Sequence, residues 1–296
     1  MSLVSRRSLL TAGAAGFLAS AAGGAYAGVI EPRFLLGVTT YELTPPGWPD
    51  DLVMSIAVIS DVHVSEPYVP MSRVKRVVET ANALNPDLIV HLGDHECTNR
   101  FVTRRVPPRE WAAAYADLSA PLGLYTVLGN HDWWANHREI RAALDGARIR
   151  VLENEAELIE HGSRRFWLAG LGDQLAHRLG FGQFDGADDL PGTLAKVKTD
   201  DPVLLLAHEP DIFVKVPPRV SLTLSGHTHG GQVHIPGLPT PWVPSAYGDR
   251  FRYGHIVEDG RHLIVSGGIG MSGVPVRLGS PPEVVMIRLG RPTAAA

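Results

Sequence analysis

Short motifs of histidine, aspartate and asparagine directly follow apolar runs at five places in the chain. They read Asp61-Val62-His63, Gly93-Asp94, Gly129-Asn130-His131-Asp132, His208 and Gly226-His227-Thr228-His229. Any one of these motifs on its own is more often a turn with capping and hydrogen-bonding roles. Together they supply imidazole, carboxylate and amide groups without a thiolate, a donor set that suits Zn, Mn or Fe. The five motifs therefore predict a metal site.

This donor set is large enough for two divalent ions about 3.5–4 Å apart that share one carboxylate. When bound, such ions move the pKa of a shared water from about 15.7 toward about 7 and so supply hydroxide at neutral pH. They also neutralise the phosphoryl oxygens, where charge must be accommodated in the transition state. We therefore expect in-line hydrolysis of a phosphate ester without a covalent phosphoenzyme. The identity of the metal stays open among Mn, Fe and Zn.

Strands must position these motifs, because each motif ends an apolar run of strand length. The runs cover residues 54–60, 88–92, 124–128, 166–171, 203–207 and 221–225. Uninterrupted apolar runs are typical of strands buried on both faces. Ligands collect at the carboxyl ends of strands in α/β sheets. Five of the six predicted strands would therefore deliver polar side chains to one edge.

Helices, hairpins and one long loop complete the expected elements. The clearest helical face, at 3.6-residue spacing, is formed by Val74, Val77, Val78, Ala81 and Leu84. Further helices are predicted over residues 110–118, 137–144 and 190–198. Turns at His161-Gly162 and Asp259-Gly260 predict two hairpins, and the Pro- and Gly-rich residues 236–254 predict a loop near the active face. The pattern indicates one α/β domain of packed sheets covered by helices.

Composition excludes several classes of protein. The chain has 296 residues, of which 45% are hydrophobic and 20% charged, and its formal net charge is 27 − 31 = −4. The apolar content is too high for a disordered chain or a coiled coil. A mildly acidic chain is also a poor nucleic-acid binder, so no nucleic-acid partner is expected. The single cysteine excludes an internal disulfide and a thiolate zinc site.

The first residues have the pattern of an export signal. Arg6 and Arg7 precede an uncharged run over residues 8–27 that ends in Ala25-Tyr26-Ala27. This segment, residues 1–27, resembles a twin-arginine signal, which implies a bacterial protein exported already folded by the twin-arginine machinery. Cleavage after Ala27 is favoured over a permanent membrane anchor. The expected location is periplasmic or otherwise extracytoplasmic, with association with a membrane surface as an option.

Three further segments follow the predicted signal. Residues 28–53 are expected to form an N-terminal lead-in, residues 54–290 the catalytic domain and residues 291–296 a flexible tail. Without residues 1–27 the net charge becomes 25 − 31 = −6.

The ordered motifs D-x-H, G-D, G-N-H-[DE], H and G-H-x-H resemble those of the calcineurin-like metallophosphoesterase superfamily. The resemblance extends over residues 54–289 and implies two mixed sheets packed face to face with helices outside. The longer form GHTHGGQ, residues 226–232, is similar to a subgroup with exported phosphodiesterases and UDP-2,3-diacylglucosamine hydrolases, which act on lipid A precursors.

The resemblance also implies roles for single residues. Asp61, His63 and His229 would hold the first metal, and Asn130, His208 and His227 the second. Asp94 would bridge both ions. His131 would approach the leaving group, oriented by Asp132, and a histidine held in this way can protonate the departing oxygen.

The substrate is less defined than the chemistry. A phosphodiester or a lipid-linked pyrophosphate is favoured, with a phosphomonoester or a non-enzymatic envelope metal-binding protein as alternatives. Trp133, Trp134 and Arg100 are candidate substrate contacts, although core packing and a solvated charge explain them as well. Loops over residues 180–192 and 236–251 could form an apolar entrance for acyl chains. Such a groove beside the metals would favour a lipid substrate, and a narrow polar pocket a small phosphoester.

Overall fold

A computed structural model describes residues 21–291 of the chain. Its first sheet has six strands in the order β1, β16, β2, β4, β6, β7. Their bounds are Gly37–Leu43, Glu283–Leu289, Met54–Ile59, Leu88–His91, Leu124–Thr126 and Arg150–Val151. Strands β2, β4, β6 and β7 are mutually parallel, and β16 is antiparallel to β2. The carboxyl ends of β2, β4 and β6 therefore lie at one edge.

The second sheet also has six strands, in the order β14, β15, β13, β12, β9, β8. Their bounds are Gly254–Glu258, Arg261–Val265, Leu222–Ser225, Val203–Leu206, Arg164–Gly170 and Glu155–His161. The four inner strands are parallel, and the antiparallel edge strands β14 and β8 arise from the two predicted hairpins. Both sheets are mixed, as the resemblance implied.

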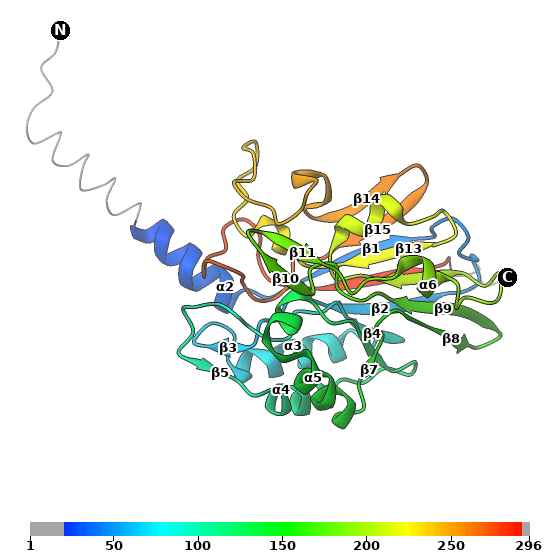
Figure 1. Cartoon of the computed structure of the whole chain (residues 1–296), viewed down its shortest axis with the longest axis horizontal. Coiled ribbons are helices and arrows are strands. Elements are labelled where there is room, and N and C mark those ends of the chain that lie inside the picture. The colour runs from blue at the N-terminus through cyan, green and yellow to red at the C-terminus, as the bar shows by residue number, and fades with distance from the viewer. Residues whose placement is uncertain (1–20, 292–296) are drawn as a thin grey trace, which may run out of the picture.

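Alternate residues of the central strands face two different layers, as the period of two in a strand requires. Ile56 and Val58 of β2 pack in one apolar cluster with Leu204 of β12, between the two sheets. Ala57 and Ile59 belong instead to a cluster with helices on the outer face. These helices are α3 (Met71–Ala83), α4 (Pro108–Tyr115) and α5 (Asn130–Gly146), which lie together below the first sheet in Figure 1. The layered, helix-flanked architecture is therefore confirmed.

The outer face of the second sheet is covered in the same way by shorter elements. Val203 and Leu205 of β12 pack with Phe213 and Leu190, which belong to the 3-10 helix Pro210–Lys215 and to α6 (Leu190–Leu194). Since both sheets are buried on both faces, their strands need the continuous apolar runs on which the prediction rested.

Some elements of the structure were not predicted from the sequence. Residues 37–43, expected in the lead-in, form the edge strand β1 that pairs with β16. The expected loop over residues 180–192 instead contains half of a hairpin, β10 (His177–Gly180) and β11 (Gln183–Asp185), and the start of α6. Helix α5 begins seven residues before the predicted helix, at Asn130 itself. Two short strands, β3 (Ser65–Glu66) and β5 (Arg104–Arg105), pair near the same edge.

A helical segment precedes β1 and extends from the body of the protein in Figure 1. It contains the π-helical turn Tyr26–Ile30 and α2 (Glu31–Phe34). The Arg277 N–H donates to the carbonyl of Ala27 (2.9 Å), and the buried Glu31 accepts from the backbone of Gly279 and Ser280. Most of the predicted signal and the last five residues of the tail lie outside the described residues. Within residues 21–291, no helix combines the length and apolarity needed to cross a bilayer.

Candidate active site

The seven predicted ligands lie together at the carboxyl ends of five strands. Asp61 and His63 follow β2, Asp94 follows β4, Asn130 follows β6, His208 follows β12, and His227 and His229 follow β13. All seven side chains are buried. Two sheets contribute to one site because the ends of their parallel strands meet at the same edge of the sandwich. This is the edge at which α/β sheets collect ligands.

The first set of donor atoms contains Asp61, His63 and His229. The Nε2 atoms of His63 and His229 lie 3.1 Å apart, and the His229 Nε2 atom lies 3.7 Å from Asp61 Oδ1. These three groups satisfy the spacing of a metal site. Asp61 is held in place by the backbone N–H of His227 (3.0 Å) and by the hydroxyl of Ser60.

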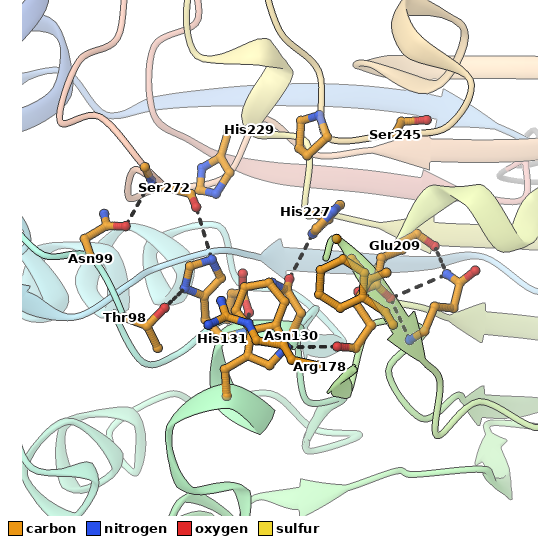
Figure 2. A pocket seen from close by; sticks show the side chains of 18 of the residues that line it. Thr98, Asn99, Asn130, His131, Arg178, Glu209, His227, His229, Ser245 and Ser272 are labelled. Atoms are coloured by element: carbon orange, nitrogen blue, oxygen red, sulfur yellow. Dashed lines mark hydrogen bonds between the residues drawn. The ribbon is translucent and has the colours of Figure 1, made fainter. Parts of the chain in front are cut away.

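The second set contains Asn130, His208 and His227. The Asn130 Oδ1 atom lies 3.1 Å from His208 Nε2 and 3.0 Å from His227 Nδ1. The two imidazole nitrogens are themselves 3.3 Å apart. Figure 2 shows the His227 and Asn130 side chains directed toward each other. This grouping is the second one that the resemblance implied.

Asp94 lies between the two sets. Its Oδ2 atom is 3.4 Å from His63 Nε2 and 3.3 Å from His208 Nε2, so one oxygen contacts an imidazole of each set. Its other oxygen accepts the backbone N–H of His131 at 2.8 Å. A carboxylate in this position can bridge two ions.

The donor atoms are arranged to bind cations rather than to form hydrogen bonds with one another. His63 Nδ1 lies 3.0 Å from the carbonyl of Glu96, and His208 Nδ1 lies 2.6 Å from that of Leu92. Because a carbonyl only accepts, each Nδ1 carries the hydrogen, and each Nε2 directs its lone pair into the site. Backbone carbonyls commonly orient metal-binding histidines in this way. Lone pairs that converge at about 3 Å favour a cation between them, so the residues present fit divalent metals.

Electrostatics maintain negative charge at the centre of the site. Burial alone would raise the pKa of Asp94, but the neighbouring His208 and His131 outweigh it and hold this pKa well below its usual value. Burial opposes charge on His208, yet Asp94 outweighs this effect, and the pKa of His208 lies well above its usual value. Burial raises the pKa of Asp61 and lowers that of His229. A cation therefore competes with a proton at His208.

The backbone is strained where the ligands lie. Five of the seven ligand positions have a left-handed backbone with φ between 49° and 67°: Asp61, His63, Asp94, His227 and His229. Such conformations are uncommon outside glycine and concentrate at functional sites. Two motif glycines allow the close approach of ligands. A Cβ atom on Gly129 would collide with Asp94 and His208, and one on Gly226 would collide with Asp61.

His131 lies beside the donor atoms, at the start of α5, and is held by hydroxyl groups. Its Nδ1 atom is 2.5 Å from Thr98 Oγ1 and its Nε2 atom 3.1 Å from Ser272 Oγ, as Figure 2 shows. The expectation that Asp132 orients this ring is wrong. The Asp132 carboxylate accepts the backbone N–H groups of Gly129 and Glu96, so it caps α5 and fixes the loop after Asp94.

Comparison with known proteins identifies the family. Residues 54–231 match the family model described as calcineurin-like phosphoesterase. The chain belongs to this family. A metallophosphoesterase from Aquifex aeolicus named as uncharacterized is 32% identical over 257 residues, which are 86% of this chain and 92% of the relative. The phosphodiesterase YaeI from Escherichia coli is 32% identical over 243 residues, 79% of this chain and 81% of the relative.

Solved structures agree on the fold. The NAD nucleotidase NadN of Haemophilus influenzae superposes with a TM-score of 0.50 at 14% identity, covering 74% of this chain and 51% of that one. As a calcineurin-like phosphoesterase, the chain is a hydrolase that depends on divalent metals. The buried carboxylate, amide and imidazole groups can bind such ions.

The phosphoesterase site opens into a cavity of about 860 Å³. Trp134 and Arg100, both predicted as substrate contacts, line it, whereas Trp133 does not: its ring packs on His137 (4.0 Å between ring centres) and against the core beneath α5. The apolar residues of the wall are Phe101, Trp134, Leu175, Phe184, Trp242 and Pro244. Phe184, Trp242 and Pro244 lie in the segments 180–192 and 236–251 that were expected to form an apolar entrance. Phe101 and Leu175 were not predicted, because they lie in loops without a periodic pattern.

Arg178 is a further pocket residue that the patterns missed. Its guanidinium carbon lies 3.4 Å from the centre of a Trp134 ring, and the indole N–H of Trp134 donates to the carbonyl of Leu175 at 2.9 Å. The Trp134 ring also lies against Phe184 and His131, with ring centres 5.7 and 5.0 Å apart. Arg178 therefore occupies a fixed position one aromatic ring away from His131.

A pair of buried acids lies behind the second ligand set. Asp173 and Glu209 are grouped with His208 at spacing suited to a metal, and one oxygen of each carboxylate lacks a hydrogen-bond partner among the described residues. Burial, followed by the charge of Glu209, raises the pKa of Asp173 well above its usual value. Glu209 lines the cavity, whereas Asp173 does not.

Proposed function

We propose that this phosphoesterase hydrolyses phosphodiesters or pyrophosphates whose non-reacting part is large and apolar, such as a lipid-linked substrate. The cavity of about 860 Å³, with Trp134, Phe184 and Trp242 in its wall and Asp94 at its floor, carries this proposal. A cavity of this size is larger than a phosphate needs and matches a drug-sized molecule. The phosphodiesterase YaeI, similar over most of its length, supports diester chemistry.

Two divalent ions are proposed, the first at Asp61, His63 and His229 and the second at Asn130, His208 and His227, with Asp94 between them. Bound ions would activate water and neutralise phosphoryl charge. The chain itself contributes orientation, because the carbonyls of Glu96 and Leu92 fix the rings of His63 and His208. His131 lines the cavity and is held by Thr98 and Ser272, and we propose that it approaches the leaving group.

A substrate panel tests this function. Purified protein of measured metal content would be assayed with bis-p-nitrophenyl phosphate, p-nitrophenyl phosphate and UDP-diacylglucosamine, before and after chelation and refilling with Mn. We expect hydrolysis of the diester and of the amphiphilic pyrophosphate, lost on chelation and restored by Mn. Exclusive hydrolysis of the monoester would establish a phosphomonoesterase instead. Unchanged diester hydrolysis by verified metal-free protein would refute the metal-dependent reaction.

We also propose that residues 1–27 direct export through the twin-arginine machinery, on the basis of Arg6, Arg7 and the uncharged run that follows them. Replacement of both arginines by lysine should retain the protein in the cytoplasm of a bacterial host. Fractionation followed by immunoblotting measures this outcome, and unchanged export of the double variant would contradict it.

A further inference from the structure

Large apolar side chains gather around the mouth of the cavity. Those with more than half of their surface exposed come from four separate segments: Phe101, Leu179, Phe181, Leu238, Trp242 and Val274. We call this set the apolar rim. Phe101 and Trp242 also line the cavity, and each other member lies on a segment with a cavity-lining neighbour, such as Gly182 for Phe181 and Gly273 for Val274. The rim side chains therefore lie on segments that also contribute residues to the cavity.

The tip of the β10–β11 hairpin is the most exposed part of the rim. Gly180, Phe181 and Gly182 have successive φ values of 92°, 51° and 74°, and Phe181 is fully exposed. A left-handed backbone is unfavourable for a bulky residue, and an exposed aromatic ring lacks the gain from burial. Burial of the ring in an apolar medium outside the chain would supply this gain.

The charged side chains near the apolar rim indicate what kind of apolar medium could cover it. Several exposed arginines of this protein pair with carboxylates, among them Arg104, Arg150, Arg164, Arg250 and Arg288. Within residues 21–291, no ion pair of Arg100 or Arg178 is present, and both line the mouth of the cavity. Arginines without acidic partners among exposed apolar side chains are typical of surfaces that bind anionic lipids.

The N-terminal helical segment lies beside the same rim. Through Ala27 and Glu31 it is bonded to residues 277–280, directly after the loop that supplies Ser272 and Gly273 to the cavity. Val29, Ile30 and Phe34 of this segment are also exposed. The described part of this segment extends from the body of the protein in Figure 1.

We propose that the apolar rim docks on the surface of an anionic lipid bilayer, with Leu179 and Phe181 inserted among the acyl chains. This inference rests on the proposed function, because a lipid-linked substrate would then enter the cavity directly from the membrane. A protein partner seated on the rim would instead cover the mouth of the cavity. The rim side chains protrude from four segments, a shape that suits a deformable bilayer.

Vesicle binding of the full chain tests the proposal. Two kinds of sucrose-loaded vesicle would be compared, phosphatidylcholine alone and phosphatidylcholine with about 30% of the anionic lipid phosphatidylglycerol. Each would be sedimented with the wild-type protein and with the variant Leu179→Ser/Phe181→Ser. We expect the double variant to bind anionic vesicles about tenfold more weakly, because two inserted apolar side chains are lost. Arg100→Gln should weaken binding to anionic vesicles only.

The matched control is Val53→Ser/Val257→Ser, which changes two exposed apolar residues at the opposite edge of the sheets and should bind like wild type. Leu179 and Phe181 do not line the cavity, so their variant should hydrolyse bis-p-nitrophenyl phosphate at the wild-type rate. Absence of vesicle binding by wild type, or equal binding by both double variants, would overturn the docking proposal and leave the diesterase activity standing. Light scattering that shows a dimer disrupted by Leu179→Ser/Phe181→Ser, with unchanged vesicle binding, would assign the rim to a second copy and also overturn it.

Discussion

The floor of the cavity, formed by the seven predicted metal ligands, and the wall of the cavity differ in the side chains and the elements that form them. The floor consists of buried polar groups at strand ends, each held by a backbone or side-chain partner, such as Asp94 by the His131 N–H. The wall consists of apolar and arginine side chains on loops and on the β10–β11 hairpin, and several of them are exposed.

The difference separates chemistry from recognition. Ligand atoms that must converge within about 3–4 Å need the rigid ends of two sheets and tolerate strained backbone, as at Asp94 and His227. Contacts to the rest of a substrate tolerate movement and are supplied by loops, which vary without loss of the core. Changes to the floor should therefore abolish turnover, and changes to the wall should alter substrate affinity.

Replacement of Asp94, the proposed bridging residue, should produce the largest effect. Asp94→Asn keeps the shape of the side chain but removes the charge between the two ligand sets, so metal content should fall and activity should decrease by more than about 100-fold. Elemental analysis and diester hydrolysis measure the two outcomes. Asp51→Asn, an exposed acid that pairs with Arg164 and does not line the cavity, is the control and should retain both. Full metal content in Asp94→Asn would contradict a bridging role.

His131 should be the next most sensitive position. His131→Ala should lose about 100-fold in turnover with most of its metal retained, because His131 lies beside the two ligand sets but its ring is held by hydroxyls. Burial lowers the pKa of His131 to about 3, so the ring is neutral at pH 7 and is expected to act as an N–H donor rather than as the acid that the resemblance implied. His131→Gln should therefore recover part of the rate. A loss of activity between pH 6 and 8 that disappears in His131→Gln would instead indicate a protonated acid.

The sequence predicted the floor far better than the wall. Buried parallel strands have continuous apolar runs, and ligands occur at fixed offsets from their ends, so Asp61 and His208 could be found from local pattern and family motifs. Arg178 and Phe184 lie on a hairpin without an apolar period, and their proximity to His131 depends on packing between distant segments. The edge strand β1 was missed because its exposed pattern lacks the signature of a buried strand. Asp132 adjoins His131 in sequence, but α5 directs its carboxylate to the backbone.

The effect of pH on metal affinity should be smaller than the effects of replacing Asp94 or His131. Since the neighbouring Asp94 outweighs burial and holds the pKa of His208 above its usual value, a cation must displace a proton from this ring. Affinity should therefore rise as pH increases, by up to about tenfold per unit for one displaced proton, until the pH exceeds that pKa. Calorimetric titration with Mn in buffers of different ionisation enthalpy measures the released proton. His208→Asn should remove this dependence, and an identical slope in the variant would assign the proton to another group.

A single change in the wall should alter affinity more than turnover. Arg178→Gln removes a charge that is held over Trp134 in the cavity wall, so KM for an anionic diester should rise about three- to tenfold, with kcat nearly constant. Arg178→Lys should recover part of this loss. Arg164→Gln, at an exposed ion pair far from the cavity, is the control. A fall in kcat without a change in KM would place Arg178 with the floor rather than the wall.

The two adjacent tryptophans provide the finest comparison, because one belongs to the core and the other to the wall. The Trp133 N–H is buried without a hydrogen-bond partner among the described residues, so Trp133→Phe should change the free energy of unfolding by less than about 1.5 kcal/mol and leave KM unchanged. Trp134→Phe removes the bond to Leu175 that orients the platform under Arg178, so KM should rise about two- to threefold with little loss of stability. Denaturant titration and steady-state kinetics on both variants measure these effects. If Trp133→Phe raised KM as much as Trp134→Phe, the boundary between core and wall would not run between these two residues.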